Sequence, residues 1–65
     1  MSDFTVNNQG TIFLLAPQTI PGHAWVDDYL PDDAQWFGNA VVVEHRYIGP
    51  IIEGIVNDGL TVEEI

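Results

Sequence analysis

The chain has 65 residues, 46% of them hydrophobic, and ten Asp and Glu stand against one Arg and no Lys, for a net charge of −9. This length excludes a second core, so we expect residues 1–65 to form a single domain, and the lack of cysteine excludes disulfides and thiolate metal sites. The charge excludes direct binding to nucleic acid or anionic membrane, because Lys and Arg recognise those surfaces.

The first part of the chain predicts a β-hairpin. Two β-prone runs in residues 4–15 flank the cluster Asn7–Gly10, and Asn and Gly accept the positive φ of a tight reversal. Residues 12–15 are apolar without alternation, which is typical of a strand that is central in a small sheet or covered on both faces.

A short helix is predicted next, over residues 21–30. Thr19 is its candidate N-cap, and Pro21 lies in the first turn, where a missing N–H costs nothing. The helix should end at Pro31. Its expected apolar side consists of Trp25, Val26, Tyr29 and Leu30.

The middle of the chain predicts a core anchor and a strand. Trp36 and Phe37 are expected to anchor the core, and Gly38-Asn39 to form a bend. Residues 40–44 form the clearest predicted strand, because they contain three consecutive valines.

The last helix is predicted to begin between Tyr47 and Gly49, because Pro50 fits only near a first turn. Gly59 followed by Leu60 matches a glycine C-cap, and residues 61–65 either add an edge strand or fray. The predicted fold is α+β in the order β-β-α-β-α, with a small antiparallel sheet, a hairpin plus a third strand, packed against two helices. The apolar stripe of the last helix consists of Ile48, Ile51, Ile52, Ile55 and Val56.

Side chains that suggest catalysis or metal binding are few. His23 and Asp27 are one helical turn apart and share a spacing that two metal ligands use, with His45, Glu44 or the Asp32-Asp33 turn as the third ligand. Glu44 beside His45 suggests a tuned general base, although neighbours on a strand point to opposite faces. Two solvent-exposed polar residues on a short helix explain the His23–Asp27 spacing better than a metal site does, and no cofactor motif is present, so we expect no enzyme activity, no bound metal and no cofactor.

The carboxylates form the most distinctive pattern. Four of them, on the polar face of the first helix and on the turn after it, predict a negatively charged ridge, and a surface of that sign favours a basic partner. Acidity that merely keeps a small domain soluble is the alternative interpretation. The residues predicted to bind the partner are Asp27, Asp28, Asp32, Asp33, Glu44, Glu53 and Asp58.

Three segments resemble small proteins of bacteria and their mobile elements: residues 34–38 (Ala-Gln-Trp-Phe-Gly), residues 43–48 (Val-Glu-His-Arg-Tyr-Ile) and residues 58–62 (Asp-Gly-Leu-Thr-Val). In size, acidity and lack of catalytic side chains the chain is also similar to phage-encoded anti-CRISPR proteins, some of which mimic DNA. That resemblance implies binding to the DNA-binding surface of a CRISPR–Cas effector complex.

The leading functional hypothesis is therefore an inhibitory protein whose anionic surface mimics nucleic acid and blocks a basic partner, such as a Cas effector subunit. The alternative is a small dimeric accessory or regulatory domain, antitoxin-like or structural, in which the apolar stripe of the last helix pairs with a copy of itself or with a toxin-like partner. Monomer and homodimer both remain open. The N-terminus lacks the features of a signal peptide, and no stretch approaches the ~20 apolar residues of a membrane span, so we expect a cytoplasmic location.

Overall fold

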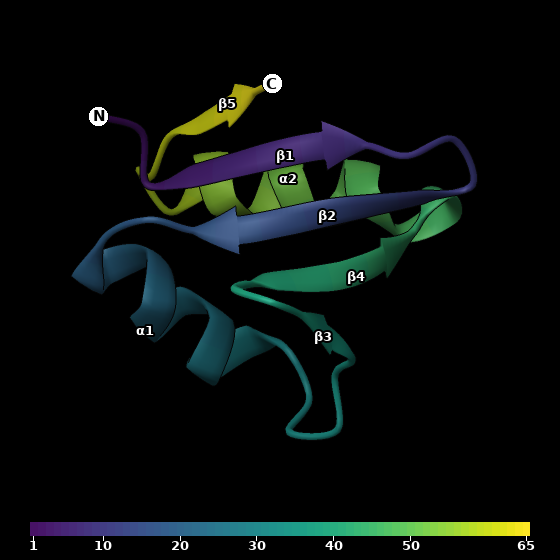
Figure 1. The fold of residues 1–65 in the computed structure, drawn as a ribbon. Coiled ribbons are helices and arrows are strands. Elements are labelled where there is room, and N and C mark those ends of the chain that lie inside the picture. The colour runs from purple at the N-terminus through teal and green to yellow at the C-terminus, as the bar shows by residue number, and fades with distance from the viewer.

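The computed structural model describes all of residues 1–65 as a five-stranded sheet and two helices (Figure 1). In chain order the elements are β1 (Phe4–Asn8), β2 (Ile12–Pro17), α1 (Ile20–Tyr29), β3 (Trp36–Phe37), β4 (Ala40–Glu44), α2 (His45–Asn57) and β5 (Val62–Glu64). The α+β class is confirmed, and β3 and β5 extend the predicted order to β-β-α-β-β-α-β. Neither helix has the length and apolar content that crossing a bilayer requires.

The strands lie in the order β3-β4-β2-β1-β5. Every neighbouring pair is antiparallel except β1 and β5, which are parallel, so the sheet is mixed and not purely antiparallel as predicted. The pairing of β5 confirms the expected edge strand at the C-terminal end. The central place of β2 confirms one of the two settings expected for its apolar run: Leu15 faces the core, and Leu14, on the other face, is half-buried between its cross-strand partners Asn7 and Val42.

The reversal between β1 and β2 is the predicted hairpin. Gly10 has a φ of 98°, a left-handed conformation that glycine adopts without steric cost. Its N–H donates to Asn8 Oδ1 at 2.8 Å, and the Gln9 N–H donates to the Ile12 carbonyl at 2.9 Å. The Asn and Gly in this turn thus have the roles that their chemistry predicts.

Helix α1 begins and ends within one residue of its predicted bounds. Thr19 is the N-cap, and its hydroxyl accepts a hydrogen bond from the Gly22 N–H at 3.1 Å. Pro21 lies in the first turn, as expected. The helix ends at Tyr29, two residues before Pro31.

Helix α2 begins earlier than predicted, at His45, with Glu44 as its N-cap. Pro50 therefore lies inside the helix, and the Arg46 carbonyl lacks the N–H donor that another residue at position 50 would supply. Both residues are exposed, so water can hydrate this carbonyl. The proline rule places the start too late because an exposed face tolerates the missing bond.

The end of α2 confirms the predicted glycine cap. Gly59 has a φ of 85°, and its N–H donates to the Val56 carbonyl at 3.0 Å. The Leu60 N–H donates to the Ile55 carbonyl at 3.1 Å. These two bonds form a Schellman motif, and Leu60 packs against the core beside the fully buried Ile55.

The core lies on one face of the sheet, where α1 and α2 pack. Trp25 joins the two helices: its indole N–H donates to Asp58 at 2.8 Å, its ring meets Phe4 edge-on at 6.0 Å, and a Cβ built on Gly54 would lie 3.4 Å from it. Tyr29, predicted on the apolar side of α1, stacks on this indole at 4.8 Å but remains exposed. The buried cluster consists of Phe4, Val6, Leu15, Trp25, Val26, Val41, Val43, Ile48 and Ile55.

Trp36 and Phe37 do not anchor the core, contrary to the prediction. They form the two-residue edge strand β3, with exposed fractions of 45% and 69%. The turn Gly38-Asn39 folds β3 back onto β4, so Trp36 pairs with Val41 and Phe37 with Ala40 at the margin of the sheet. At that margin no helix covers the aromatic rings.

An unpredicted cluster around Asp3 fastens the N-terminal segment. The Asp3 carboxylate accepts hydrogen bonds from Thr19 Oγ1 at 2.6 Å and from the Thr61 N–H at 3.1 Å. Its backbone carbonyl also accepts from the Gln18 N–H at 2.8 Å. The Thr19 hydrogen bond, followed by that of Thr61, lowers the pKa of Asp3 below its ordinary value of 3.8. Asp3 thus ties the start of β1 to the cap of α1 and to the start of β5.

Candidate protein-binding surface

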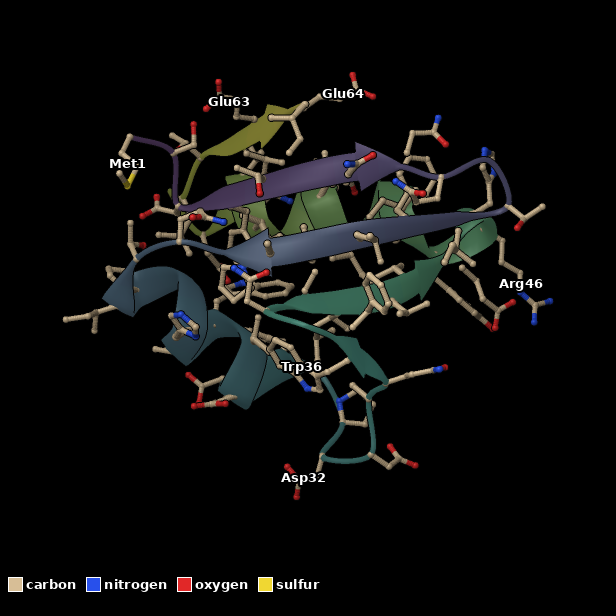
Figure 2. The ribbon with its side chains drawn as sticks, viewed as in Figure 1. Met1, Asp32, Trp36, Arg46, Glu63 and Glu64 are labelled. Atoms are coloured by element: carbon tan, nitrogen blue, oxygen red, sulfur yellow. The ribbon has the colours of Figure 1, made fainter.

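Four of the seven predicted partner-binding carboxylates lie together. Asp27 and Asp28 occupy the last turn of α1, and Asp32 and Asp33 form the turn that follows. Figure 2 shows Asp32 at the tip of this loop, pointing away from the sheet. All four are exposed, and none takes part in an ion pair or side-chain hydrogen bond.

This cluster is electrostatically unfavourable for the isolated fold. The C-terminal end of a helix carries partial negative charge, and α1 has no basic residue in its last turn to compensate the two carboxylates there. The next two carboxylates lie in the following turn and add to the same local potential. The end of α1 is therefore a surface that a cationic group would stabilise.

The other three predicted residues lie on different elements. Glu44, at the end of β4, pairs with Arg46 at 3.4 Å, and both side chains are largely exposed. Glu53 is exposed on α2, and Asp58 accepts the indole hydrogen bond of Trp25. The role of Asp58 is therefore structural. Figure 2 places Arg46 and Asp32 at separate ends of the molecule.

The ten carboxylates therefore surround the molecule and do not share one face. Glu63 and Glu64 lie on β5, at the sheet edge opposite β3 (Figure 2). Because the seven predicted residues do not form one continuous patch, the structure limits any imitation of a nucleic acid strand to part of its surface.

An open apolar groove runs beside the clustered carboxylates, with a volume of about 470 Å³. It lies between the α1–β3 segment and the first half of α2, along β4. Pockets of this size hold small ligands or single side chains of a partner. The groove is lined by Leu30, Pro31, Ala34, Val41, Val42, Val43, Glu44, Tyr47, Pro50 and Ile51.

Carboxylates border the groove on both sides. Asp32 and Asp33 directly follow Pro31 on one wall, and Glu44 belongs to the lining of the other. Glu53 comes two residues after Ile51, about 200° further around α2, and does not line the groove. We call this feature the acid-rimmed groove and define it by the lining residues with Asp32 and Asp33. The structure thus brings three of the seven predicted residues to one feature, which sequence spacing alone does not reveal.

The chemistry of the acid-rimmed groove suits Lys and Arg side chains. Their aliphatic stems pack on apolar surface while their charged ends stay in water, where a carboxylate can pair with them. Tyr47, half exposed in the groove, already has the Arg46 guanidinium 4.9 Å from its ring centroid. An incoming cation that takes this aromatic face must displace Arg46 from it.

The two histidines lie on different helices. His23 is exposed on α1, and His45 packs against Phe13 with 5.3 Å between ring centroids. Nowhere in the chain do three or more His, Asp or Glu side chains gather as metal ligands would. The spacing of His23 and Asp27 is therefore that of two exposed residues on one helix.

Exposed aromatic rings are the feature that sequence reasoning missed. Tyr29, with 62% exposure, directly follows Asp28 of the acidic cluster, and Trp36 and Phe37 come shortly after the Asp32-Asp33 turn. A local signal exists: β-prone residues on both sides of Gly38-Asn39 indicate a second hairpin, whose first strand lies at an edge.

No family model, curated protein or solved structure matches this chain.

Proposed function

We propose that this protein is an inhibitory binding protein that occupies a basic, nucleic-acid-binding surface of another protein through its acid-rimmed groove. The observation that supports this proposal is an open apolar groove that has Glu44 in its lining and the unpaired Asp32 and Asp33 directly after its lining residue Pro31. Protein interfaces combine an apolar centre with a polar rim, and aromatic residues are enriched in them. A CRISPR–Cas effector complex is the partner class that we propose to test first.

The net charge supports the choice of a basic partner. A charge of −9 on 65 residues attracts cationic surfaces at long range and accelerates encounter with them. The longest axis of the molecule is 27 Å, a length over which one DNA strand presents about eight phosphates. Because only part of the carboxylates lies at the groove, we propose that the protein replaces a few phosphate contacts and adds apolar contacts that DNA does not make.

The test measures whether the protein prevents a Cas effector complex from binding its target DNA. Purified Cas effector complexes are mixed with labelled target DNA and increasing amounts of the protein, and bound DNA is followed by electrophoretic mobility. We expect displacement that weakens as salt rises from about 50 to about 500 mM, because screening shortens the range of the attraction. A parallel capture from bacterial lysate at both salt concentrations extends the search to other basic proteins.

Two matched variants locate the surface. Asp32→Asn/Asp33→Asn removes two charges beside the groove, and Glu63→Gln/Glu64→Gln removes two from the opposite sheet edge. Both leave the same net charge, so only position differs. We expect the first to weaken partner binding by at least about tenfold and the second to change it little. Equal losses would show that only total charge matters, and a lack of any basic partner would refute the proposed function.

The alternative function is dimerisation through the apolar stripe of the last helix, and most of that stripe is not accessible to a partner. Ile48 and Ile55 of that stripe are buried in the core, and Ile51 and Ile52 are half-buried against it. Only Val56 is exposed. The stripe of α2 thus holds the helix to the sheet.

A further inference from the structure

The only arginine of the chain lies at the margin of the acid-rimmed groove. Arg46 Nε is 3.4 Å from Glu44 Oε2, and the guanidinium carbon is 4.9 Å from the ring centroid of Tyr47. Glu44 and Tyr47 both line the groove, whereas Arg46 does not. The guanidinium therefore reaches these two groups from outside the groove, and Figure 2 shows the Arg46 side chain at the outer margin of the molecule.

Glu44 and Tyr47 present the two kinds of group that recognise an arginine. They are the only carboxylate and the only aromatic ring in the lining, and the other lining residues are apolar. The carboxylate supplies negative charge, and the flat ring suits the planar guanidinium, which stacks on aromatic faces. Arg46 meets both groups because it is their neighbour in sequence, and its contacts show what kind of side chain fits there.

Weak contacts hold Arg46 at this position. It lies in the first turn of α2, where the partial positive charge of the helix N-terminus disfavours a cation. The side chain of Arg46 is 72% exposed and that of Glu44 is 62% exposed. Ion pairs and cation–π contacts that are this exposed contribute little to stability. Arg46 is therefore a displaceable occupant.

An arginine of a partner can make one contact that Arg46 does not. Its aliphatic stem can lie on the apolar lining of the groove while its guanidinium reaches Glu44 and Tyr47. Arg46 approaches the same two groups from outside this lining, so it leaves the apolar surface uncovered. The incoming arginine thus replaces both contacts of Arg46 and buries additional apolar surface, which favours the exchange.

We propose that Glu44 and Tyr47 form an arginine-binding subsite of the acid-rimmed groove, which Arg46 occupies in the free protein and one arginine of the basic partner takes over on binding. This inference rests on the proposed function for its partner, and a short peptide tests the subsite without that partner. Arg46 is then an internal competitor. It lowers the affinity of the groove for cations and favours partners that also fill the apolar centre.

NMR spectra of the full chain report the exchange directly. Because Arg46 is the only arginine, its Nε–H gives a single arginine side-chain signal. The probe is a capped peptide, Ala-Leu-Arg-Leu-Ala, and two matched peptides carry Lys or the neutral analogue citrulline in place of Arg. We expect the arginine peptide to move the Arg46 Nε–H signal toward its position in urea, together with the ring signals of Tyr47. The lysine peptide should move them less, and the citrulline peptide should leave them unchanged.

Two variants of equal net charge separate the subsite from overall charge. Arg46→Gln and Ile20→Glu each add one unit of negative charge to the −9 of the wild type, and Ile20 is 85% exposed at the start of α1. We expect Arg46→Gln to bind the arginine peptide about three- to tenfold more tightly, because its subsite is always free. Ile20→Glu should change this affinity less than about twofold at about 150 mM salt, which screens distant charges.

A third variant tests the preference for arginine. Tyr47→Leu keeps the net charge and an apolar side chain, and it should bind the arginine and lysine peptides with similar affinity. The inference is overturned if the arginine peptide leaves the Arg46 signal in place, if it binds wild type and Arg46→Gln equally, or if the wild type does not prefer it to the lysine peptide.

The proposed function has a separate readout, the displacement of DNA from the effector complex. If the subsite fails these tests while Asp32→Asn/Asp33→Asn still weakens partner binding, the proposed function stands and the inference about Arg46 is wrong. If the subsite passes while no basic partner is found, arginine binding stands and the proposed function is wrong.

Discussion

Gly22 lies where the first turn of α1 meets the segment before β1. A Cβ at this position would be 2.5 Å from the backbone carbonyl oxygen of Asp3, and an ordinary contact of this kind begins near 3.4 Å. A Gly22→Ala substitution must therefore move the two segments apart by about 0.9 Å. Gly49, in the middle of α2, offers the opposite case, because nothing lies within 4 Å of a Cβ built there.

The shift that Gly22→Ala requires would disturb the hydrogen bonds that Asp3 makes. The Asp3 carbonyl accepts from the Gln18 N–H at 2.8 Å, and its carboxylate accepts from Thr19 Oγ1 at 2.6 Å. Overpacking costs about 1–3 kcal/mol, and a weakened hydrogen bond adds about 1 kcal/mol. The higher helix propensity of Ala returns up to about 1 kcal/mol, which leaves a net loss of about 1–3 kcal/mol for Gly22→Ala. Gly49→Ala keeps only the favourable part, a gain of about 0.5–1 kcal/mol.

Urea unfolding followed by far-UV circular dichroism measures both variants against the wild type. We expect the free energies of unfolding of the two variants to differ by about 2 kcal/mol, with similar dependence on urea, and their melting temperatures by about 10 °C. A Gly22→Ala variant as stable as Gly49→Ala would refute the reasoning, because it would mean that the contact with Asp3 is not tight in solution.

Three further predictions concern single side chains. The Thr19 hydrogen bond lowers the pKa of Asp3, so the ionised carboxylate stabilises the fold above the ordinary pKa of 3.8, and this stabilisation is lost as the pH falls through the lower pKa of the folded state. The free energies of unfolding of the wild type and of Asp3→Asn, measured in urea between about pH 2 and 5, should therefore converge as the solution becomes more acidic. Trp25→Phe should lower the unfolding free energy by about 1–3 kcal/mol, since it removes the hydrogen bond to Asp58 and part of a buried ring, as chemical denaturation would report. Pro50→Ala should raise the free energy of unfolding by about 1–3 kcal/mol, because it restores a backbone N–H inside α2, and calorimetry should show a higher melting temperature. An unchanged melting temperature would show that the proline does not destabilise the helix.

Features set by neighbours in sequence were predictable. The Asn8-Gln9-Gly10 turn, the Thr19 cap and the Gly59-Leu60 cap each depend on bonds between residues a few positions apart, and all three are confirmed. The strand Ala40–Glu44 was recognisable because β-branched residues suit a pleated surface, and it has the predicted bounds.

Features that depend on pairing between distant parts of the chain were not predictable from the sequence. The parallel pairing of Phe4 with Val62 joins segments 58 positions apart, and no local pattern reports it. The exposure of Trp36 has the same origin: an apolar residue is expected inside, and only the place of β3 at the sheet edge leaves it outside.

The candidate site shows the same division. Helical and turn spacing placed Asp28 and Asp32 near each other, because both belong to one short segment. Glu44 reaches the same groove only because β4 packs beside the α1–β3 segment. Asp58 was counted as a free charge, although a tryptophan 33 positions earlier in the chain donates to it.

The two tryptophans occupy contrasting surroundings, which gives the unlabelled protein two optical reporters. Trp25 is enclosed between the helices and should emit at short wavelength, shielded from aqueous iodide. Trp36 is half open to water on β3 and should emit further to the red and be quenched readily. Unfolding will change mainly the first signal, whereas an event at the sheet margin will change the second, so one emission spectrum can separate loss of structure from occupation of the surface.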